Sequence, residues 1–275
     1  MITQSAVSMM IKELEKEVGA QLVHRGKVAQ LTPAGEALRL SGQRAMDEVD
    51  QAVAAIRGGG QLKTGLLRLA VGHLTAATLF PKALKLFKQR QPHIAVEVLD
   101  GPVEQGSRLV IGEEVDAAIG SVDSHPSRMA LLYAEELMRD PLCVVSSRHF
   151  DIVTRARNKI SWDEIGQTEV ILIDRIYGQW RSLFLEVAKK GIDLRVAYDV
   201  KLYSTAVEMV RNGLGVVLLP SFVAKRLDPD EFRTMLLGDS PGDWVIHWVE
   251  KRNIPRAPGL AELKGALQET LSGIQ

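Results

Sequence analysis

The chain has 275 residues, of which 46% are hydrophobic and 25% charged, a composition typical of globular proteins with room for one small and one large domain. Its 34 Lys and Arg residues balance its 34 Asp and Glu residues, so net charge favours neither nucleic acid nor a membrane surface. The single Cys143 excludes an internal disulfide, and no apolar run approaches the roughly 20 residues of a membrane span. The sequence opens without a basic region followed by an apolar core, so we expect a cytoplasmic protein.

An amphipathic helix is predicted before Gly19, which would end it. Its apolar positions recur at spacings of three or four residues, as one face of a helix requires: Val7, Ile11, Leu14, Val18 and then Leu22. The opposite face carries small polar or basic side chains suited to base edges and phosphates: Gln4, Ser5, Ser8, Lys12 and Lys16. A lone helix cannot bury such an apolar stripe, so we expect another helix or a partner to cover it. Arg25, Gly26 and Lys27 are expected in a turn.

A second, longer helix is predicted to begin with Thr32 as N-cap and Pro33 at the first helical position. Apolar or small residues follow at alternating spacings of four and three, which is a heptad pattern: Leu38, Gly42, Ala45, Val49, Ala52 and Ile56. Three glycines at 58–60 end it. Since a solitary helix of this kind is marginal in water, we expect it to pair with a second copy; the alternative is that it packs on its own domain.

The remaining chain alternates apolar strands with helices. Strands are predicted over 66–72, 94–99, 115–120, 142–146, 170–173, 196–202, 216–219 and 244–250. Helices are predicted around 79–87, over 107–111, from a capping box at 161–164, and over 180–190, 205–212 and 260–271. Strands that are apolar on both faces predict parallel sheets. The pattern indicates an α/β fold of two lobes, with the last elements returning to the first lobe.

These elements together resemble the LysR-type transcriptional regulators along essentially the whole chain. The most specific matches are Gln4-Ser5-Ala6-Val7-Ser8, Ile11-Lys12-Glu13-Leu14-Glu15, Val18-Gly19, Gln21-Leu22 and Leu31-Thr32-Pro33-Ala34-Gly35. Weaker matches are Leu67 to Gly72, Val115 to Gly120, and Val210 to Val216 with Leu219-Pro220. The resemblance implies a partial winged helix-turn-helix (recognition helix and wing) in 1–31 and a linker or dimerisation helix with hinge in 32–60. It further implies a two-lobed effector domain in 61–275, akin to type 2 periplasmic binding proteins. Lobe one would comprise about 65–139 plus 240–275, and lobe two about 140–239.

For DNA, the resemblance implies that the first helix enters the major groove with Gln4, Ser5, Ser8, Met9 and Lys12. Arg25 and Lys27 would lie on the wing, near phosphate or the minor groove. The chain departs from the family in two respects. Relatives carry about two further helices before the recognition helix, and they often have Arg or Gln where this chain has Met9-Met10, whose thioethers cannot make bidentate base contacts. The alternative is therefore an effector-binding or interaction protein that does not bind DNA.

For the effector, ligands of open α/β lobes bind at the carboxyl ends of the strands. The candidate residues follow predicted strands: His73, Thr75, Ser121, Asp174, Tyr203, Ser204 and Thr205. The resemblance places 73–75 and 203–205 on facing walls of one cleft, with Ser121 and Asp174 at its rim. Tyr203, Ser204 and Thr205 open a helix, whose free N–H groups favour an anion, so we expect a small carboxylate-bearing metabolite. For Ser204 and Thr205, plain helix capping is an equal alternative.

Other chemistry is not indicated. The six histidines lie far apart without carboxylates or thiols at a metal-ligand spacing, so we expect no metal and no cofactor. Cys143 lies in an apolar run and is predicted to be a buried small side chain rather than a redox sensor. The sequence contains no phosphate-binding glycine loop and no nucleophile elbow, which favours a regulator over an enzyme. The expected partners are DNA, a small effector and the chain itself, as a dimer or tetramer.

Overall fold

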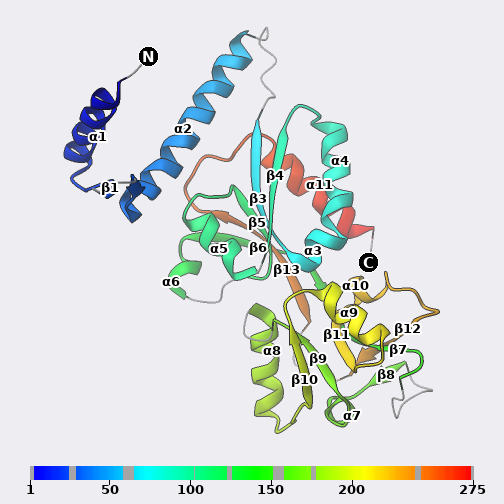
Figure 1. The fold of residues 1–275 in the computed structure, drawn as a ribbon. Helices are drawn as coiled ribbons and strands as arrows, with labels where there is room; N and C mark the ends of the chain where they lie inside the picture. Colours follow the sequence, from blue (N-terminus) through cyan, green and yellow to red (C-terminus); the bar gives the residue numbers. More distant parts are fainter. Residues whose placement is uncertain are drawn as a thin grey trace. The chain divides into compact units, whose positions relative to one another are not determined.

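The computed structural model describes residues 3–24, 29–57, 65–101, 103–122, 126–150, 158–174, 178–238 and 243–273. The chain divides into two compact units, Met1–Thr64 and Gly65–Gln275, and each is considered by itself (Figure 1). Within these described ranges, no helix is long and apolar enough to cross a membrane.

The N-terminal unit contains two helices separated by a short hairpin: α1 (Gln4–Val18), β1 (Val23–His24), β2 (Gln30–Leu31) and α2 (Pro33–Arg57). Thr3 caps α1 by accepting a hydrogen bond from the Ala6 N–H, and Gly19 ends the helix in the left-handed conformation at φ 73°. The predicted end of the helix at Gly19 is confirmed, because only glycine adopts such an angle at little cost.

Hydrogen bonds and one tight contact join these elements around Leu22. The Glu15 carboxylate accepts the Leu22 N–H at 2.7 Å, which ties α1 to the hairpin. Thr32 Oγ1 donates to the Gln21 carbonyl at 2.6 Å and accepts the Gly35 N–H at 3.0 Å, so the predicted cap of α2 is confirmed. A Cβ on Gly35 would lie 2.0 Å from the Leu22 carbonyl oxygen. Only glycine allows this approach, which fixes the start of α2 against the hairpin.

The first sheet of the C-terminal unit has five strands in the order β4-β3-β5-β13-β6. β3 runs parallel to β4 and β5, whereas β13 is antiparallel to β5 and β6. The strands are β3 (Leu66–Gly72), β4 (Ala95–Gly101), β5 (Ala117–Gly120), β6 (Leu132–Asp140) and β13 (Trp244–Lys251). The helices are α3 (His73–Thr78), α4 (Phe80–Arg90), α5 (Val103–Ile111), α6 (Pro126–Met129) and α11 (Leu260–Ser272). α4 and α11 pack together, and α5 lies against β3 and β5 (Figure 1).

The second sheet has six strands in the order β10-β9-β11-β7-β12-β8. β10, β9 and β11 are parallel, and β7 is antiparallel to β11 and β12. The strands are β7 (Leu142–Ser147), β8 (Lys159–Ile160), β9 (Val170–Ile173), β10 (Val196–Val200), β11 (Val216–Pro220) and β12 (Phe232–Leu237). The helices are α7 (Trp162–Gly166), α8 (Gly178–Lys189), α9 (Tyr203–Arg211) and α10 (Ser221–Ala224). We call the first sheet with its helices lobe one and the second sheet with its helices lobe two.

The prediction of parallel sheets holds for only part of each sheet, because both sheets mix parallel and antiparallel pairs. β7, which is antiparallel to both of its neighbours, is buried along its whole length, so this antiparallel strand has the apolar pattern that is typical of parallel ones. β6 and β12 were not predicted, since polar residues interrupt both. Two helix starts are also corrected: α5 begins at Val103 rather than 107, and α9 at Tyr203 rather than 205. The capping box at Ser161 is confirmed.

Candidate ligand-binding site

A hollow of about 270 Å³ lies in lobe one at the carboxyl ends of three neighbouring strands. Small side chains form much of its wall, because α5 approaches the sheet closely: a Cβ on Gly106 would lie 3.0 Å from the Cβ of Ala118. Asp100, Gln105 and Ser121 are the polar residues of the described lining. The described lining consists of Ala70, Val71, Gly72, Leu99, Asp100, Gly101, Gln105, Gly106, Leu109, Ala118, Ile119, Gly120 and Ser121. The hollow is thus mainly apolar with a few polar groups, as small-molecule sites are.

The three candidates in lobe one all lie beyond the ends of β3 or β5. Ser121 is buried and lines the hollow. His73 and Thr75 form the first turn of α3, directly after β3; Thr75 is buried, and neither is among the described lining residues. Gln105 and Gly106 were not among the predicted site residues, because the helix after β4 was predicted to start at 107, four residues too late. The signal that could have found them is the polar, glycine-containing run that follows β4.

In lobe two, Asp174 follows β9 in a left-handed conformation, with φ 50°. Its N–H donates to the Val200 carbonyl at 2.8 Å, and its carboxylate lies 2.6 Å from Nζ of Lys201, which follows β10. The carboxylate is largely buried, at 14% exposure, whereas the Lys201 side chain is 65% exposed. The ends of β9 and β10 are thus joined by an ion pair, and Lys201 is a basic residue at this edge that the sequence reasoning missed.

Tyr203, Ser204 and Thr205 form the first turn of α9. The N-cap is Leu202, which provides no side-chain hydrogen bond. The capping alternative for Ser204 and Thr205 is therefore wrong, because both lie inside the helix, where their side chains are exposed. An N-terminal turn without a side-chain cap leaves N–H groups that can meet an anion.

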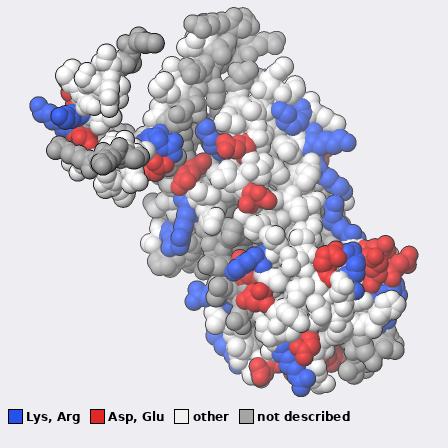
Figure 2. All heavy atoms as spheres, viewed as in Figure 1, with Lys and Arg blue, Asp and Glu red and all other residues white. Residues whose placement is uncertain are grey.

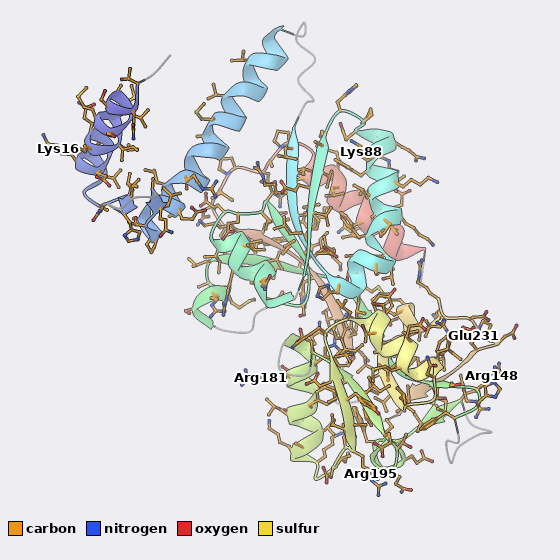
Figure 3. All side chains as sticks on the ribbon, viewed as in Figure 1. Lys16, Lys88, Arg148, Arg181, Arg195 and Glu231 are labelled. Atoms are coloured by element: carbon orange, nitrogen blue, oxygen red, sulfur yellow. The ribbon has the colours of Figure 1, made fainter. Side chains whose placement is uncertain are left out.

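The candidate DNA-contacting side chains that are described lie on α1. Gln4, Ser5, Ser8, Met9 and Lys12 are all exposed, whereas Arg25 and Lys27 lie outside the described residues. Lys16 also points away from the helix (Figure 3). α1 contains no buried residue within this unit. The most exposed positions of its apolar face are at 41–47%: Val7, Leu14 and Val18.

Of the candidate dimerisation residues on α2, Leu38 is half-buried and Ala45 and Val49 are exposed. The side chains of Ala52 and Ile56 lie outside the described residues. Met46 and Val53 are further exposed apolar side chains on this helix. Between residues 33 and 53, α2 therefore presents apolar groups that the N-terminal unit does not cover.

Charge is mixed over the face shown in Figure 2, where basic and acidic side chains are interspersed on both sheets' helices. An acidic group gathers at one end of lobe two, where Glu231 and Arg148 lie close together (Figures 2 and 3). Glu231 accepts a hydrogen bond from Arg211 there at 3.0 Å. Among the residues that the structure describes, no group of His, Cys, Asp and Glu side chains could hold a metal ion. Cys143 is buried, as predicted, and burial raises the pKa of its thiol to about 11.

The family comparison covers both units. Residues 60–272 match the LysR substrate binding domain, and residues 1–36 match the bacterial regulatory helix-turn-helix protein of the lysR family. The chain therefore belongs to the LysR family, whose members are transcriptional regulators rather than enzymes. The predicted fold class, a two-lobed α/β effector domain of the type 2 periplasmic-binding-protein kind behind a helix-turn-helix segment, is confirmed.

Individual relatives are distant in sequence but similar along most of their length. The chain is 29% identical to the probable HTH-type transcriptional regulator LrrA of Synechococcus elongatus, over 83% of this chain and 76% of that protein. It is 26% identical to YfeR of Shigella flexneri, an uncharacterized HTH-type transcriptional regulator, over 86% and 79%. Among solved structures it is similar to HinK of Pseudomonas aeruginosa, with TM-score 0.67, 17% identity and coverage of 100% and 91%. CbnR in complex with its target DNA gives TM-score 0.67, 17% identity and coverage of 98% and 91%. These two structures support the fold alone.

His247 lies beside the hollow, and its buried environment can be tested through the pH dependence of the protein's stability. It lies on β13 opposite Gly120, to whose backbone its imidazole makes a hydrogen bond, while its buried Nδ1 finds no partner among the described residues. Burial lowers the pKa of the imidazole below its usual 6.5; the Glu136 charge and the bond to Gly120 raise it, and the Arg139 charge lowers it. Because the unfolded chain then binds the proton more tightly, this group's contribution to stability is complete above pH 6.5 and is lost as the pH falls through the lower folded pKa.

We predict that His247→Gln, which stays neutral but keeps a donor for Gly120, reduces the loss of stability between about pH 7.5 and pH 5.5. The measurement is the urea midpoint of both proteins across this range. Other titrating groups are the same in both, so the difference between the two curves isolates His247. Parallel curves would show that its folded pKa is not lowered.

Proposed function

We propose that this LysR family member is a ligand-responsive, DNA-binding regulator whose effector is a small, carboxylate-bearing metabolite bound between the two lobes. The observation that carries the proposal is the hollow at the carboxyl ends of β3, β4 and β5, at the edge where open α/β sheets bind ligands. The candidate contacts are those named from the sequence, His73, Thr75, Ser121, Asp174, Tyr203, Ser204 and Thr205, with Gln105 and Lys201 added by the geometry.

The preference for an acid is supported by two features of lobe two. The first turn of α9 has no side-chain cap, so its N–H groups and the positive end of the helix dipole are available to an anion. Lys201 places an ammonium group at the ends of the neighbouring strands. A carboxylate carried by a small apolar body would match these groups on one side and the apolar hollow on the other.

Effector binding is tested by calorimetry with a panel of small carboxylic acids and their matched amides. We expect at least one acid to bind at least tenfold more tightly than its amide, because charge-assisted hydrogen bonds are about twice as strong as neutral ones. Gln105→Leu should weaken that binding about tenfold, through the loss of one hydrogen bond to the ligand. Gln167→Leu is the matched control, since Gln167 is an exposed glutamine that follows α7, away from the hollow. Binding of the amides alone would contradict the acid preference.

DNA binding is proposed to use the exposed face of α1. We expect the chain to bind DNA that flanks its own gene more tightly than random duplex in a fluorescence anisotropy assay. Gln4→Ala should weaken only the specific complex, by about 1–3 kcal/mol, because a bidentate amide–adenine contact discriminates bases by that amount. Lys12→Ala should weaken both complexes and reduce their salt dependence, since a phosphate contact carries no sequence information. Equal affinity for every duplex would favour the alternative, an effector-binding protein that does not bind DNA.

Self-association is proposed to use the apolar stripe of α2, with Leu38, Ala45, Val49, Ala52 and Ile56 in the seam and the effector domains as a second interface. The exposure of Val49, 61%, supports this because an aliphatic side chain in a heptad pattern is normally covered. We predict that Val49→Glu lowers the mass measured by sedimentation equilibrium at micromolar concentration. Ala37→Glu is the matched control, because Ala37 is exposed on the same helix outside the seam. Equal masses for the two variants would place the interface elsewhere.

In this proposal the effector acts by its differential affinity for two arrangements of the lobes. A ligand that binds both arrangements equally shifts neither. The groups that it contacts must therefore change position relative to one another when the lobes move, which applies to contacts contributed by different lobes.

A further inference from the structure

Gln179, in the first turn of α8, makes two hydrogen bonds to one residue of the other lobe. Its Oε1 accepts the backbone N–H of Val245 at 2.8 Å, and its Nε2 donates to the carbonyl of the same residue. Val245 lies on β13, in the sheet of lobe one, whereas α8 belongs to lobe two. The Gln179 side chain therefore joins lobe two to lobe one through both the N–H and the carbonyl group of Val245.

The register of the first sheet explains why a side chain is needed at this point. β13 pairs with β5 over three residues, from His247 opposite Gly120 to Val249 opposite Ala118, and β5 ends at Gly120. If this register continued, Val245 would lie opposite Val122, which is beyond the end of β5. The Gln179 amide, with one donor and one acceptor in a plane, takes the place of the missing strand peptide. An unpaired backbone polar group away from water is costly. The arrangement of the lobes in which the Gln179 amide reaches the backbone of Val245 is therefore favoured.

A tryptophan pair lies next to this hydrogen-bonded contact. Trp180, the next residue of α8, packs on Trp244 of β13 with ring centroids 4.9 Å apart and planes tilted by 46°. Both indoles are buried, and with Leu142 and Leu183 they line a cavity of about 160 Å³. The indole packing and the Gln179 hydrogen bonds therefore act at the same contact between α8 and β13.

We propose that Gln179 is a positioning residue that fixes α8 on β13 and thereby sets the angle between the lobes when no effector is bound. The location of α8 supports a link to ligand binding: it is the helix that follows β9, and Asp174, at the end of β9, lies five residues before Gln179 in the chain. A ligand that contacts the end of β9 therefore acts on the segment that leads to this contact. That link to the effector rests on the function proposed above, but the positioning role does not.

The test compares Gln179→Met with Gln268→Met in the full chain. Methionine has nearly the size of glutamine but cannot donate or accept as the amide does. Gln268 is the matched control because its amide donates only within lobe one, to Glu135 at 3.1 Å. Hydrogen–deuterium exchange of the Val245 amide reports directly on its hydrogen bond to Gln179. We expect exchange at least tenfold faster in Gln179→Met and unchanged in Gln268→Met.

The angle between the lobes is measured by pulsed electron spin resonance between labels at Lys85→Cys, on α4, and Asp163→Cys, on α7, both exposed positions. Cys143 does not interfere, since it is buried and its raised pKa keeps it protonated. We expect the distance distribution to shift or broaden in Gln179→Met and to stay unchanged in Gln268→Met.

Gln179→Glu separates positioning from simple packing. The protonated carboxyl group has the donor and acceptor of the amide, whereas the carboxylate has only acceptors. We expect the distance distribution of this variant to approach that of the parent near pH 4 and that of Gln179→Met near pH 7.

Unchanged exchange and distances in Gln179→Met would overturn the proposal, as would equal changes in Gln179→Met and Gln268→Met, which would indicate general destabilisation. Loss of pH dependence in Gln179→Glu would also contradict it. None of these readouts uses an effector, so a failure of the acid titrations would leave the positioning role intact and the proposed effector wrong.

Discussion

The buried carboxylate of Asp140 fixes the point about which the two lobes are joined. It is the last residue of β6, where the chain crosses from the first sheet to the second, and it accepts the Phe222 N–H at the start of α10 at 2.9 Å. The Pro141 carbonyl accepts the preceding N–H, that of Ser221, at 2.9 Å. Burial raises the pKa of this carboxyl, and the bond from Phe222 lowers it. Without this buried acid, the Phe222 N–H at the start of α10 would lose its acceptor.

The position where the chain passes from the first sheet to the second is fixed at Asp140. Other contacts between the lobes then determine the angle between them. On α10's side, Arg226 donates to the Thr78 carbonyl of lobe one at 3.1 Å. On α8's side, Gln179 and Trp180 contact β13. A single hydrophobic cluster also includes buried residues of both sheets, such as Val71 and Val144. Separating the lobes completely would expose this core, so the shared cluster opposes complete separation and favours changes that leave it covered.

The sequence predicted the elements whose signals are local. The bounds of β9, the capping box at Ser161 and the start of α2 at Pro33 follow from neighbouring residues alone. β6 was missed because it is an edge strand whose exposed and buried positions do not alternate regularly. The position of the hollow at the strand ends was predictable from topology, but most of its described lining was not, since it depends on α5 approaching the sheet at Gly106. The contact of Gln179 with Val245 joins residues 66 positions apart and depends on where β5 ends, which no local pattern indicates.

The end of β9 is where these constraints meet the proposed ligand. A non-glycine residue in the left-handed region, as Asp174 is, costs of the order of 1 kcal/mol, and its ion pair with Lys201 and its hydrogen bond to Val200 hold it there. Since Lys201 is mostly exposed, that ion pair contributes little, about 0–1 kcal/mol. In the proposed function, a ligand carboxylate competes with Asp174 for this exposed ammonium group, and the largely buried Asp174 carboxylate then loses its partner. Asp174 would then have less to hold it in its unfavourable conformation. A weak, strained contact at this position suits a response to a ligand better than a strong one, because the bound and free arrangements must differ by only a few kcal/mol for a small molecule to switch them.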